Sequence, residues 1–271
     1  MSLKNELLKE ANDLKDELDK RRPLPSNLVK DLKEDFYIKN TYHSNAIEGN
    51  TLTLYETKAV LEDGITIQGK SFREHAEANN HKEAIEYVEE LINKDIPLNQ
   101  RTIKDIHAIV MQGIDRSIAG KYRDTSALIT GANHTPPLPE KVLDEMDDLM
   151  DWYENSNDLH PVEKASLLHA KFVNIHPFAD GNGRTSRLLM NFELMKDKFP
   201  PITIEKEDRF RYYEVLDISG TDGNYEPFTS FIAEREIKTL ERYLELSRDN
   251  KQEKNNIQEV KKNNKNNEHE R

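Results

Sequence analysis

A polar, glycine-rich turn between two apolar segments carries residue types suited to phosphoryl-group chemistry. Residues 176–187 read His-Pro-Phe-Ala-Asp-Gly-Asn-Gly-Arg-Thr-Ser-Arg. Apolar side chains at helical spacing precede this turn from Val162 to Ile175 and follow it from Leu188 to Leu194. The pattern therefore predicts a turn that two core helices hold on a rigid frame.

The glycines and arginines of this turn favour the binding of an anion. Gly181 and Gly183 have no Cβ, so the backbone can approach a ligand closely. The turn opens a helix, whose first N–H groups and positive dipole end attract negative charge. Arg184 and Arg187 share one helix face and add two guanidinium groups.

Three further residues of the turn complete a set for phosphoryl-group transfer. His176 can accept a proton near neutral pH and is the candidate base for an incoming hydroxyl. Asp180 offers a hard oxygen ligand that suits Mg²⁺ beside a polyphosphate. Asn182 can donate its amide to a phosphoryl oxygen. Each residue alone would read as a cap or a turn, but their conjunction favours catalysis by positioning and charge stabilisation.

The string HPFADGNGRTSR resembles the signature of Fic-domain proteins, HPFx(D/E)GNGRxxR, and matches every fixed position. A looser resemblance extends from about Thr41 to Ile237. It implies a helical domain that transfers AMP from Mg-ATP to a Tyr, Thr or Ser hydroxyl of a target protein. By this resemblance, His176 deprotonates the hydroxyl and Asp180 holds Mg²⁺ between the α- and β-phosphates.

The resemblance also implies the phosphate contacts. Asn182 and the Gly181–Gly183 backbone would bind the α- and β-phosphates, Arg184 the β-phosphate and Arg187 the γ-phosphate. Family members that transfer phosphate lack the second glycine of Gly-Asn-Gly. Retention of Gly183 therefore favours nucleotidyl transfer.

A second motif lies upstream of this turn, at Ser44 and Glu48. The two residues are one turn apart on a helix that Gly49 ends. A glutamate is unfavourable at a helix C-terminus, so we expect it to have a cationic partner. The string resembles the Fic inhibitory motif (S/T)xxxE(G/N), which implies that Glu48 pairs with Arg187, occupies the γ-phosphate site and autoinhibits the protein. In some members the same glutamate positions water to remove AMP, so a dual activity stays open.

Helical periodicity dominates the rest of the chain. It predicts an all-α architecture with one hairpin-like flap. The resemblance implies that this is a Fic-type helical domain with a small β-hairpin flap and an N-terminal inhibitory helix. The expected division is residues 1–52 with the inhibitory motif, 53–248 as the catalytic domain, and 249–271 as a polar tail that is disordered or a solvated helix end. The expected helices cover residues 3–20, 26–49, 53–63, 71–92, 99–112, 140–153, 161–175, 184–196, 208–218 and 227–247.

The flap belongs to the break in periodicity between Gly120 and Pro139. By resemblance, it would pair with an extended segment of the target protein, as in β-strand addition. Its candidate docking residues are Ile129, Thr130, Gly131, Ala132, Asn133 and His134. Two aromatic residues, Tyr225 in a loop and Tyr213, are candidates for the adenine pocket.

Composition and charge limit the binding partners and the cellular compartment that we expect for this protein. The net charge is −12 with a pI near 5.3, which disfavours nucleic acid as the main partner. There is no cysteine, so thiolate sites are excluded. The charged start lacks a signal-peptide core, and no apolar run approaches the roughly 20 residues of a membrane span. We therefore expect a cytoplasmic protein without a membrane partner, with a homodimer through residues 3–20 left open.

Two other sequence patterns are typical of different sites, a phosphate-binding P-loop and a zinc site. Residues 64–71 match GxxxxGK[ST], but no buried strand precedes them, so a turn between helices is expected. His160, His169 and His176 could suggest zinc, but no HExxH string or carboxylate at ligand spacing supports it, and His169 is expected in the core. The functional alternatives are transfer of another nucleotide, removal of AMP, or a regulatory module that binds ATP without turnover. A pure binder would need neither His176 nor Asp180.

Overall fold

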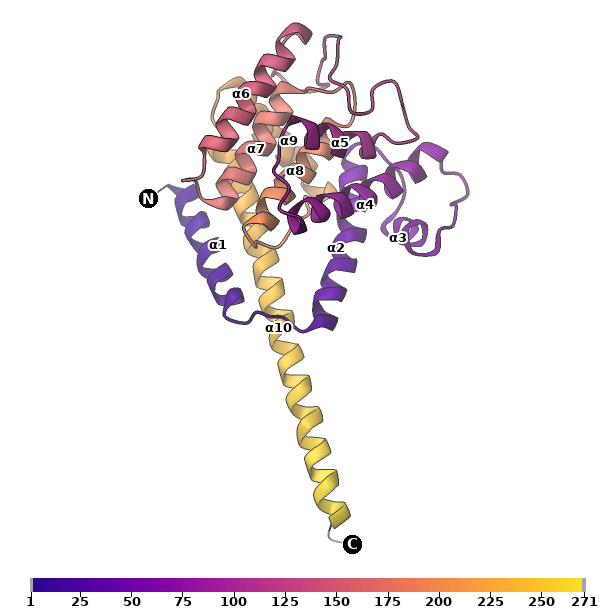
Figure 1. Ribbon diagram of the computed structural model, residues 1–271, viewed down its shortest axis with the longest axis vertical. Coiled ribbons are helices and arrows are strands. Elements are labelled where there is room, and N and C mark those ends of the chain that lie inside the picture. The colour runs from indigo at the N-terminus through magenta and orange to yellow at the C-terminus, as the bar shows by residue number, and fades with distance from the viewer. Residues whose placement is uncertain (1, 270–271) are drawn as a thin grey trace.

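A computed structural model describes residues 2–269, with side chains through Arg248. These residues form helices and no strand, which confirms the predicted all-α class (Figure 1). Two short 3₁₀ helices cover Pro139–Lys141 and Lys206–Asp208. The α-helices are α1 (Leu3–Asp19), α2 (Ser26–Ile47), α3 (Leu54–Asp63), α4 (Phe72–Asn93), α5 (Gln100–Val110), α6 (Val142–Asn155), α7 (Pro161–Ile175), α8 (Asn182–Lys196), α9 (Arg209–Thr221) and α10 (Glu226–His269).

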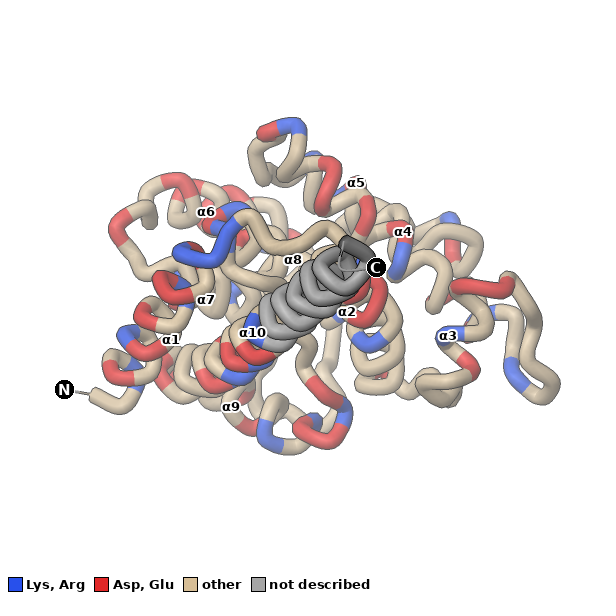
Figure 2. Tube along the Cα trace, turned by 90° about the horizontal axis from the view of Figure 1, so that it is seen from below, with Lys and Arg blue, Asp and Glu red and all other residues tan. Residues whose placement is uncertain are grey.

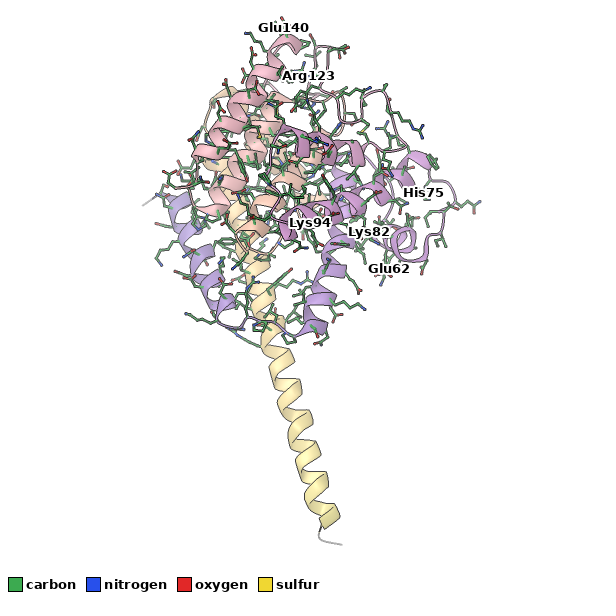
Figure 3. All side chains as sticks on the ribbon, viewed as in Figure 1. Glu62, His75, Lys82, Lys94, Arg123 and Glu140 are labelled. Carbon is green, nitrogen blue, oxygen red and sulfur yellow. The ribbon has the colours of Figure 1, made fainter. Side chains whose placement is uncertain are left out.

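Helix α8 lies among the other helices near the centre of the fold (Figure 1). Its side chains contribute to two hydrophobic clusters. Leu188, Leu189 and Phe192 pack into a cluster with α4, α5, α6 and α7. Met190 and Leu194 pack into the other, with α1, α9 and α10. Full burial of such a side chain contributes about 1.5–3 kcal/mol, so this helix and the turn before it are firmly held. Figure 3 shows how side chains fill the space between the helices.

The segment between α3 and α4 is a turn, which confirms the structural reading of residues 64–71. Gly64 ends α3 in the left-handed conformation, and Ser71 opens α4 with a capping box completed by Glu74. Thr53 and Glu56 form the same box at the start of α3. This segment has helices on both sides, so it lacks the strand that a phosphate-binding P-loop requires.

Helix α1 packs against α10 (Figure 1). Ala11 and Leu18 are fully buried in the second cluster, and Arg21 donates to the Leu244 carbonyl at 2.8 Å. The N-terminal helix therefore covers the core of its own chain, and a homodimer through it stays a prediction. None of the described helices is long and apolar enough to cross a membrane.

The predicted β-hairpin flap is not confirmed, because residues 120–138 contain no strand. A backbone bond from Ala132 to the Ile129 carbonyl, at 3.1 Å, makes a turn instead. Pro136 and Pro137 cannot donate to a ladder. Side-chain contacts described below, rather than strand pairing, hold this segment in place.

The last helix extends beyond the expected end near residue 247 and reaches His269. The Lys-, Asn- and Glu-rich sequence contains no proline or glycine that would stop it. Side chains beyond Arg248 lie outside the described part of the chain, so the division at 52 and 248 stays a prediction. In Figure 2, acidic and basic residues are interspersed over the described helices.

Candidate active site

The turn between α7 and α8 begins at His176, which adopts the left-handed conformation with φ 52° and ψ 55°. Its N–H donates to the Phe172 carbonyl at 3.1 Å and so caps α7. Gly181, with φ 80°, precedes α8. A non-glycine residue in this conformation costs about 1–2 kcal/mol, so neighbouring contacts must hold His176 there.

Arg123 supplies several of those contacts, and the sequence analysis gave it no role. Its Nε donates to the His176 carbonyl at 2.8 Å, and its backbone N–H donates to the Pro177 carbonyl at 2.9 Å. Its other nitrogens donate to the carbonyls of Thr125 and Pro137. Arg123, labelled in Figure 3, therefore ties the segment before α6 to the histidine turn.

His107 on α5 is a second residue that the sequence analysis missed. Its Nδ1 accepts the Gly120 N–H at 3.0 Å, and its Nε2 lies 2.8 Å from the Asp180 carbonyl. Its ring stacks on Phe178 with centroids 3.6 Å apart. Burial lowers the pKa of His107 to about 4, so the ring is neutral and Nε2 donates to Asp180. A lone histidine in an apolar helix gave no sequence signal of this role.

The start of α8 presents backbone N–H groups as expected, but the Asn182 side chain does not. Its amide donates to the Phe178 carbonyl at 2.8 Å and accepts the Phe178 N–H at 2.9 Å. The structure thus holds this buried side chain by two bonds inside the turn. The contact of its amide with phosphate stays a prediction. The N–H of Thr185 donates to the Gly181 carbonyl and is the first helical bond of α8. Before it in the first turn come the backbone N–H groups of Asn182, Gly183 and Arg184.

Arg184 and Arg187 are each only 2% exposed, and both are paired. Arg187 donates to Oε1 of Glu48 at 2.7 Å, and to the hydroxyl and the carbonyl of Ser44 at 2.9 Å each. Arg184 lies 3.2 Å from carboxylates of Glu77 and Asp180. The structure thus brings the two upstream motif residues against the second arginine of the turn.

Asp180 is the carboxylate of the turn, and its chemistry fits Mg²⁺. Burial would raise its pKa, but Arg184 and Arg73 outweigh burial and hold the pKa below its usual range. Among the described residues, no three acidic or histidine side chains gather as a metal cluster. Mg²⁺ is commonly held by one or two carboxylates together with substrate phosphates and water, so a single carboxylate beside an anion site suffices.

Residues 97–194, which include the turn, match the Fic/DOC family. The solved structure of Fic-1, residues 134–508, from C. elegans shares 33% identity and superimposes with a TM-score of 0.84, covering 91% of this chain and 73% of that one. The chain belongs to the Fic/DOC family.

Two more relatives agree with this Fic/DOC assignment. A curated "Protein adenylyltransferase Fic" of Nematostella vectensis is 40% identical over 238 residues, which cover 84% of this chain and 55% of the relative. A Fic domain containing signaling protein from Bacteroides thetaiotaomicron is 29% identical with a TM-score of 0.81, covering 88% and 97% of the two chains. This chain spans about half the length of the curated relatives it matches.

The aromatic candidates separate in this Fic fold. Tyr213 lies at the site: burial and the nearby Glu48 raise its pKa, and its ring lies 5.3 Å from that of Tyr212. The Tyr212 hydroxyl contacts both Arg187 and His169. His169 is fully buried, as expected.

Tyr225 has different neighbours, and its place in the adenine pocket stays a prediction. It packs on the second hydrophobic cluster with the Lys171 ammonium 5.1 Å from its ring centroid. Among the described residues, no hydrogen bond or ring contact is seen between it and residues 176–187. The neighbouring Asn224 accepts the N–H of Glu226 at the start of α10.

The flap segment (Ile129–His134) is fastened at its end to α9 of this Fic fold. Asp217 accepts the N–H and the side-chain amide of Asn133 at 2.8 and 2.7 Å, and the N–H of His134 at 2.9 Å. The two ring nitrogens of His134 lie 3.0 and 2.8 Å from the carbonyls of Gly220 and Asn174. The segment is thereby held beside the end of α7, where His176 follows.

Proposed function

We propose that this chain transfers AMP from ATP to a hydroxyl side chain of another protein. The proposal depends on one observation: a histidine and a helix N-terminus with two buried guanidinium groups occupy a single turn. The name of the Nematostella vectensis relative, protein adenylyltransferase, supports the same chemistry.

In this proposal, His176 acts as the base. Burial lowers its pKa more than the nearby Glu48 raises it, so the imidazole is neutral near pH 7 and can accept a proton. The hydroxyl oxygen then bonds to the α-phosphorus, the bond to the bridging oxygen breaks, and pyrophosphate leaves. The hydroxyl proton goes to His176.

The start of α8 would bind the phosphates through the N–H groups of Asn182, Gly183 and Arg184. The Arg184 guanidinium adds a fixed positive charge at the β-phosphate. Asp180 would hold Mg²⁺, which supplies positive charge to neutralise the phosphate oxygens. Most of the rate enhancement would come from positioning and charge stabilisation.

We also propose that the chain is autoinhibited. Glu48 occupies the guanidinium of Arg187 that the γ-phosphate would require. A carboxylate at this place competes for the cation and repels a phosphate. Removal of AMP from a modified protein is a second candidate function, because the Glu48 carboxylate contacts the same segment as His176, at Arg187.

Radiolabelled transfer tests the proposal. The protein is incubated with ATP labelled at the α-phosphate, Mg²⁺ and a cell lysate, and ATP affinity is measured separately. We expect label on protein with Glu48→Gly, and loss of label with the Glu48→Gly, His176→Ala pair while ATP affinity changes less than about threefold. ATP binding without any label would favour the regulatory module. Label retained without His176 would contradict the proposed base.

A further inference from the structure

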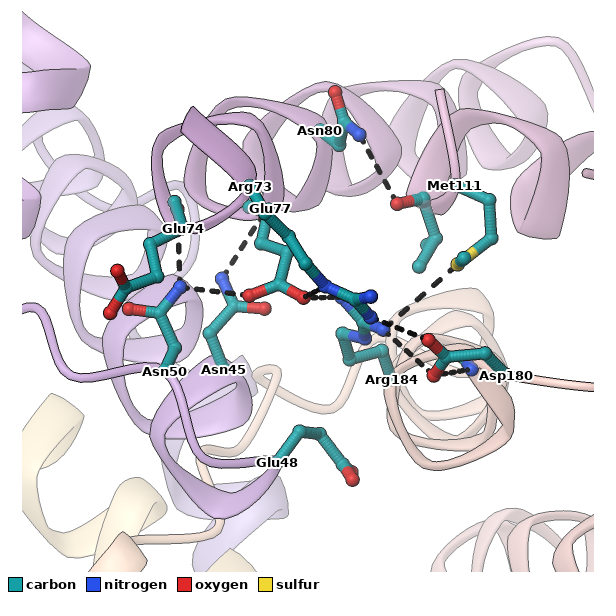
Figure 4. A network of polar contacts seen from close by, with 12 residues as sticks. Asn45, Glu48, Asn50, Arg73, Glu74, Glu77, Asn80, Met111, Asp180 and Arg184 are labelled. Atoms are coloured by element: carbon teal, nitrogen blue, oxygen red, sulfur yellow. Dashed lines mark hydrogen bonds and ion pairs between the residues drawn. The ribbon is translucent and has the colours of Figure 1, made fainter. Parts of the chain in front are cut away.

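Two carboxylates and two guanidinium groups form a closed ring beside the α8 N-terminus (Figure 4). Asp180 Oδ1 lies 3.2 Å from Arg184, which lies 3.2 Å from Oε1 of Glu77. The same Glu77 oxygen accepts Nε of Arg73 at 3.0 Å, and Nη2 of Arg73 donates to Oδ2 of Asp180 at 2.6 Å. Opposite charges therefore alternate around the ring.

Arg73 differs from the other members of this ring. Its side chain is 56% exposed and comes from the first turn of α4, whereas Arg184 is 2% exposed and belongs to α8. Gly181 and Arg184 use Oδ1 of Asp180, while Arg73 takes Oδ2. Arg73 therefore covers the carboxylate oxygen that the turn itself leaves available.

We propose that Arg73 is a built-in competitor for the divalent metal at Asp180, and this inference rests on the proposed function. A divalent ion ligated by Oδ2 would approach to about 2.0–2.1 Å. The guanidinium already contacts that oxygen, and two cations at one oxygen repel each other strongly. Metal binding must therefore break the ion pair between Arg73 and Asp180. The exposed, long side chain of Arg73 can move into solvent when it is displaced.

Contacts on α4 hold Arg73 in the competing position. Glu77 orients the guanidinium from one turn further along the same helix. The second oxygen of Glu77 accepts the amide of Asn50 at 3.0 Å, and Asn50 follows Glu48 by two residues. The contacts of Glu48 and Arg73 are therefore connected through Asn50 and Glu77. Each contact nevertheless occupies a different group of the site. Glu48 covers the arginine expected at the γ-phosphate, and Arg73 covers the metal ligand.

Binding of Mn²⁺ tests this inference directly. Mn²⁺ is titrated into the protein, saturated with an ATP analogue whose α–β bridge is a methylene group, and followed by electron paramagnetic resonance. The variants are Arg73→Gln and, as a matched loss of one positive charge on the same helix, Lys82→Gln. Lys82 lies further along α4, where it pairs with Glu86. Each variant is made with Glu48 and with Glu48→Gly, and its fold is checked by thermal unfolding.

We expect Arg73→Gln to tighten Mn²⁺ binding by about threefold, the size expected for removal of a half-exposed ion pair. The change should be the same with either residue at position 48, and Lys82→Gln should leave the affinity unaltered. Equal affinities for Arg73→Gln and Lys82→Gln, or weaker binding by Arg73→Gln, would overturn the inference alone. If no variant binds Mn²⁺ with the nucleotide, even with Glu48→Gly, the proposed function fails and the inference fails with it.

Discussion

Oε1 of Glu48 lies 2.7 Å from Nη2 of Arg187, although the two residues are 139 positions apart. The same oxygen would lie 2.2 Å from a Cβ built on Gly183. The carboxylate that follows α2 therefore lies against the first turn of α8, at the helix end that attracts anions. An acidic side chain in this place imitates part of the charge of the expected phosphate substrate.

Removal of the Glu48 charge should raise nucleotide affinity. We expect Glu48→Gln to increase ATP affinity and AMP transfer by about tenfold, because the Arg187 charge becomes available to phosphate. Calorimetry and labelled transfer measure the two effects. Glu34→Gln, an exposed change on the same helix, is the control. An equal effect of both variants would show that general surface charge, not this contact, is responsible.

The free energy of unfolding should depend on the contact between Glu48 and Gly183. Gly183→Ala places a methyl group against the Glu48 carboxylate and Nη1 of Arg187, at 2.2 and 3.1 Å. We expect it to lower the free energy of unfolding by about 1 kcal/mol, and by less in a Glu48→Gly background. A double-mutant cycle from urea unfolding measures the coupling. Strictly additive effects would contradict the close approach.

The stability of the protein should fall in mild acid. His107 has its pKa lowered by burial from 6.5 to about 4, so between these pH values the unfolded chain binds a proton that the folded chain excludes. Its contribution is complete above pH 6.5 and is lost as the pH falls toward 4, by roughly 3 kcal/mol. His81, whose pKa falls to about 3 through burial, acts in the same direction.

The variant His107→Gln isolates the first of these groups. Urea unfolding between pH 4 and 7 should show a shallower dependence on pH than the wild type, because one excluded proton is gone. An unchanged slope would mean that the other buried histidines carry the whole effect. Loss of the bond to the Asp180 carbonyl should also lower AMP transfer.

The position of the flap segment should depend on its hydrogen bonds to Asp217. Asp217→Ala removes the acceptor of three hydrogen bonds from Asn133 and His134. We expect the KM for the target protein to rise about tenfold while ATP affinity stays constant, because only the docking segment is released. Steady-state transfer kinetics measure this. The exposed Asp222→Ala at the end of α9 serves as the control, and a parallel loss of ATP affinity would refute the assignment.

The sequence predicted the helices and the chemistry of one turn because both depend on local order. Helical spacing of apolar residues places α7 and α8, and the capping boxes at Thr53 and Ser71 mark two helix starts. The residue types from His176 to Arg187 indicate phosphoryl-group chemistry. The sequence shows this because these residues are neighbours in the chain. The pairing of Glu48 with Arg187 was predicted only from the family resemblance.

Residues distant in sequence were placed by the tertiary structure alone. Arg73, His107 and Arg123 contact the turn from other elements through backbone carbonyls or one carboxylate oxygen. A single chain carries no local pattern for such contacts, because any donor that packing brings near a carbonyl can make them.

The amide of Asn182, which bonds inside its own turn, and the packing of Tyr225 on the second hydrophobic cluster follow the same principle. Residue type shows what a side chain is able to do, and in this protein the sequence indicated that for the proposed base, the two arginines and the proposed metal ligand. Packing decided which partner each side chain meets, because buried polar groups must bond to whatever the fold places beside them.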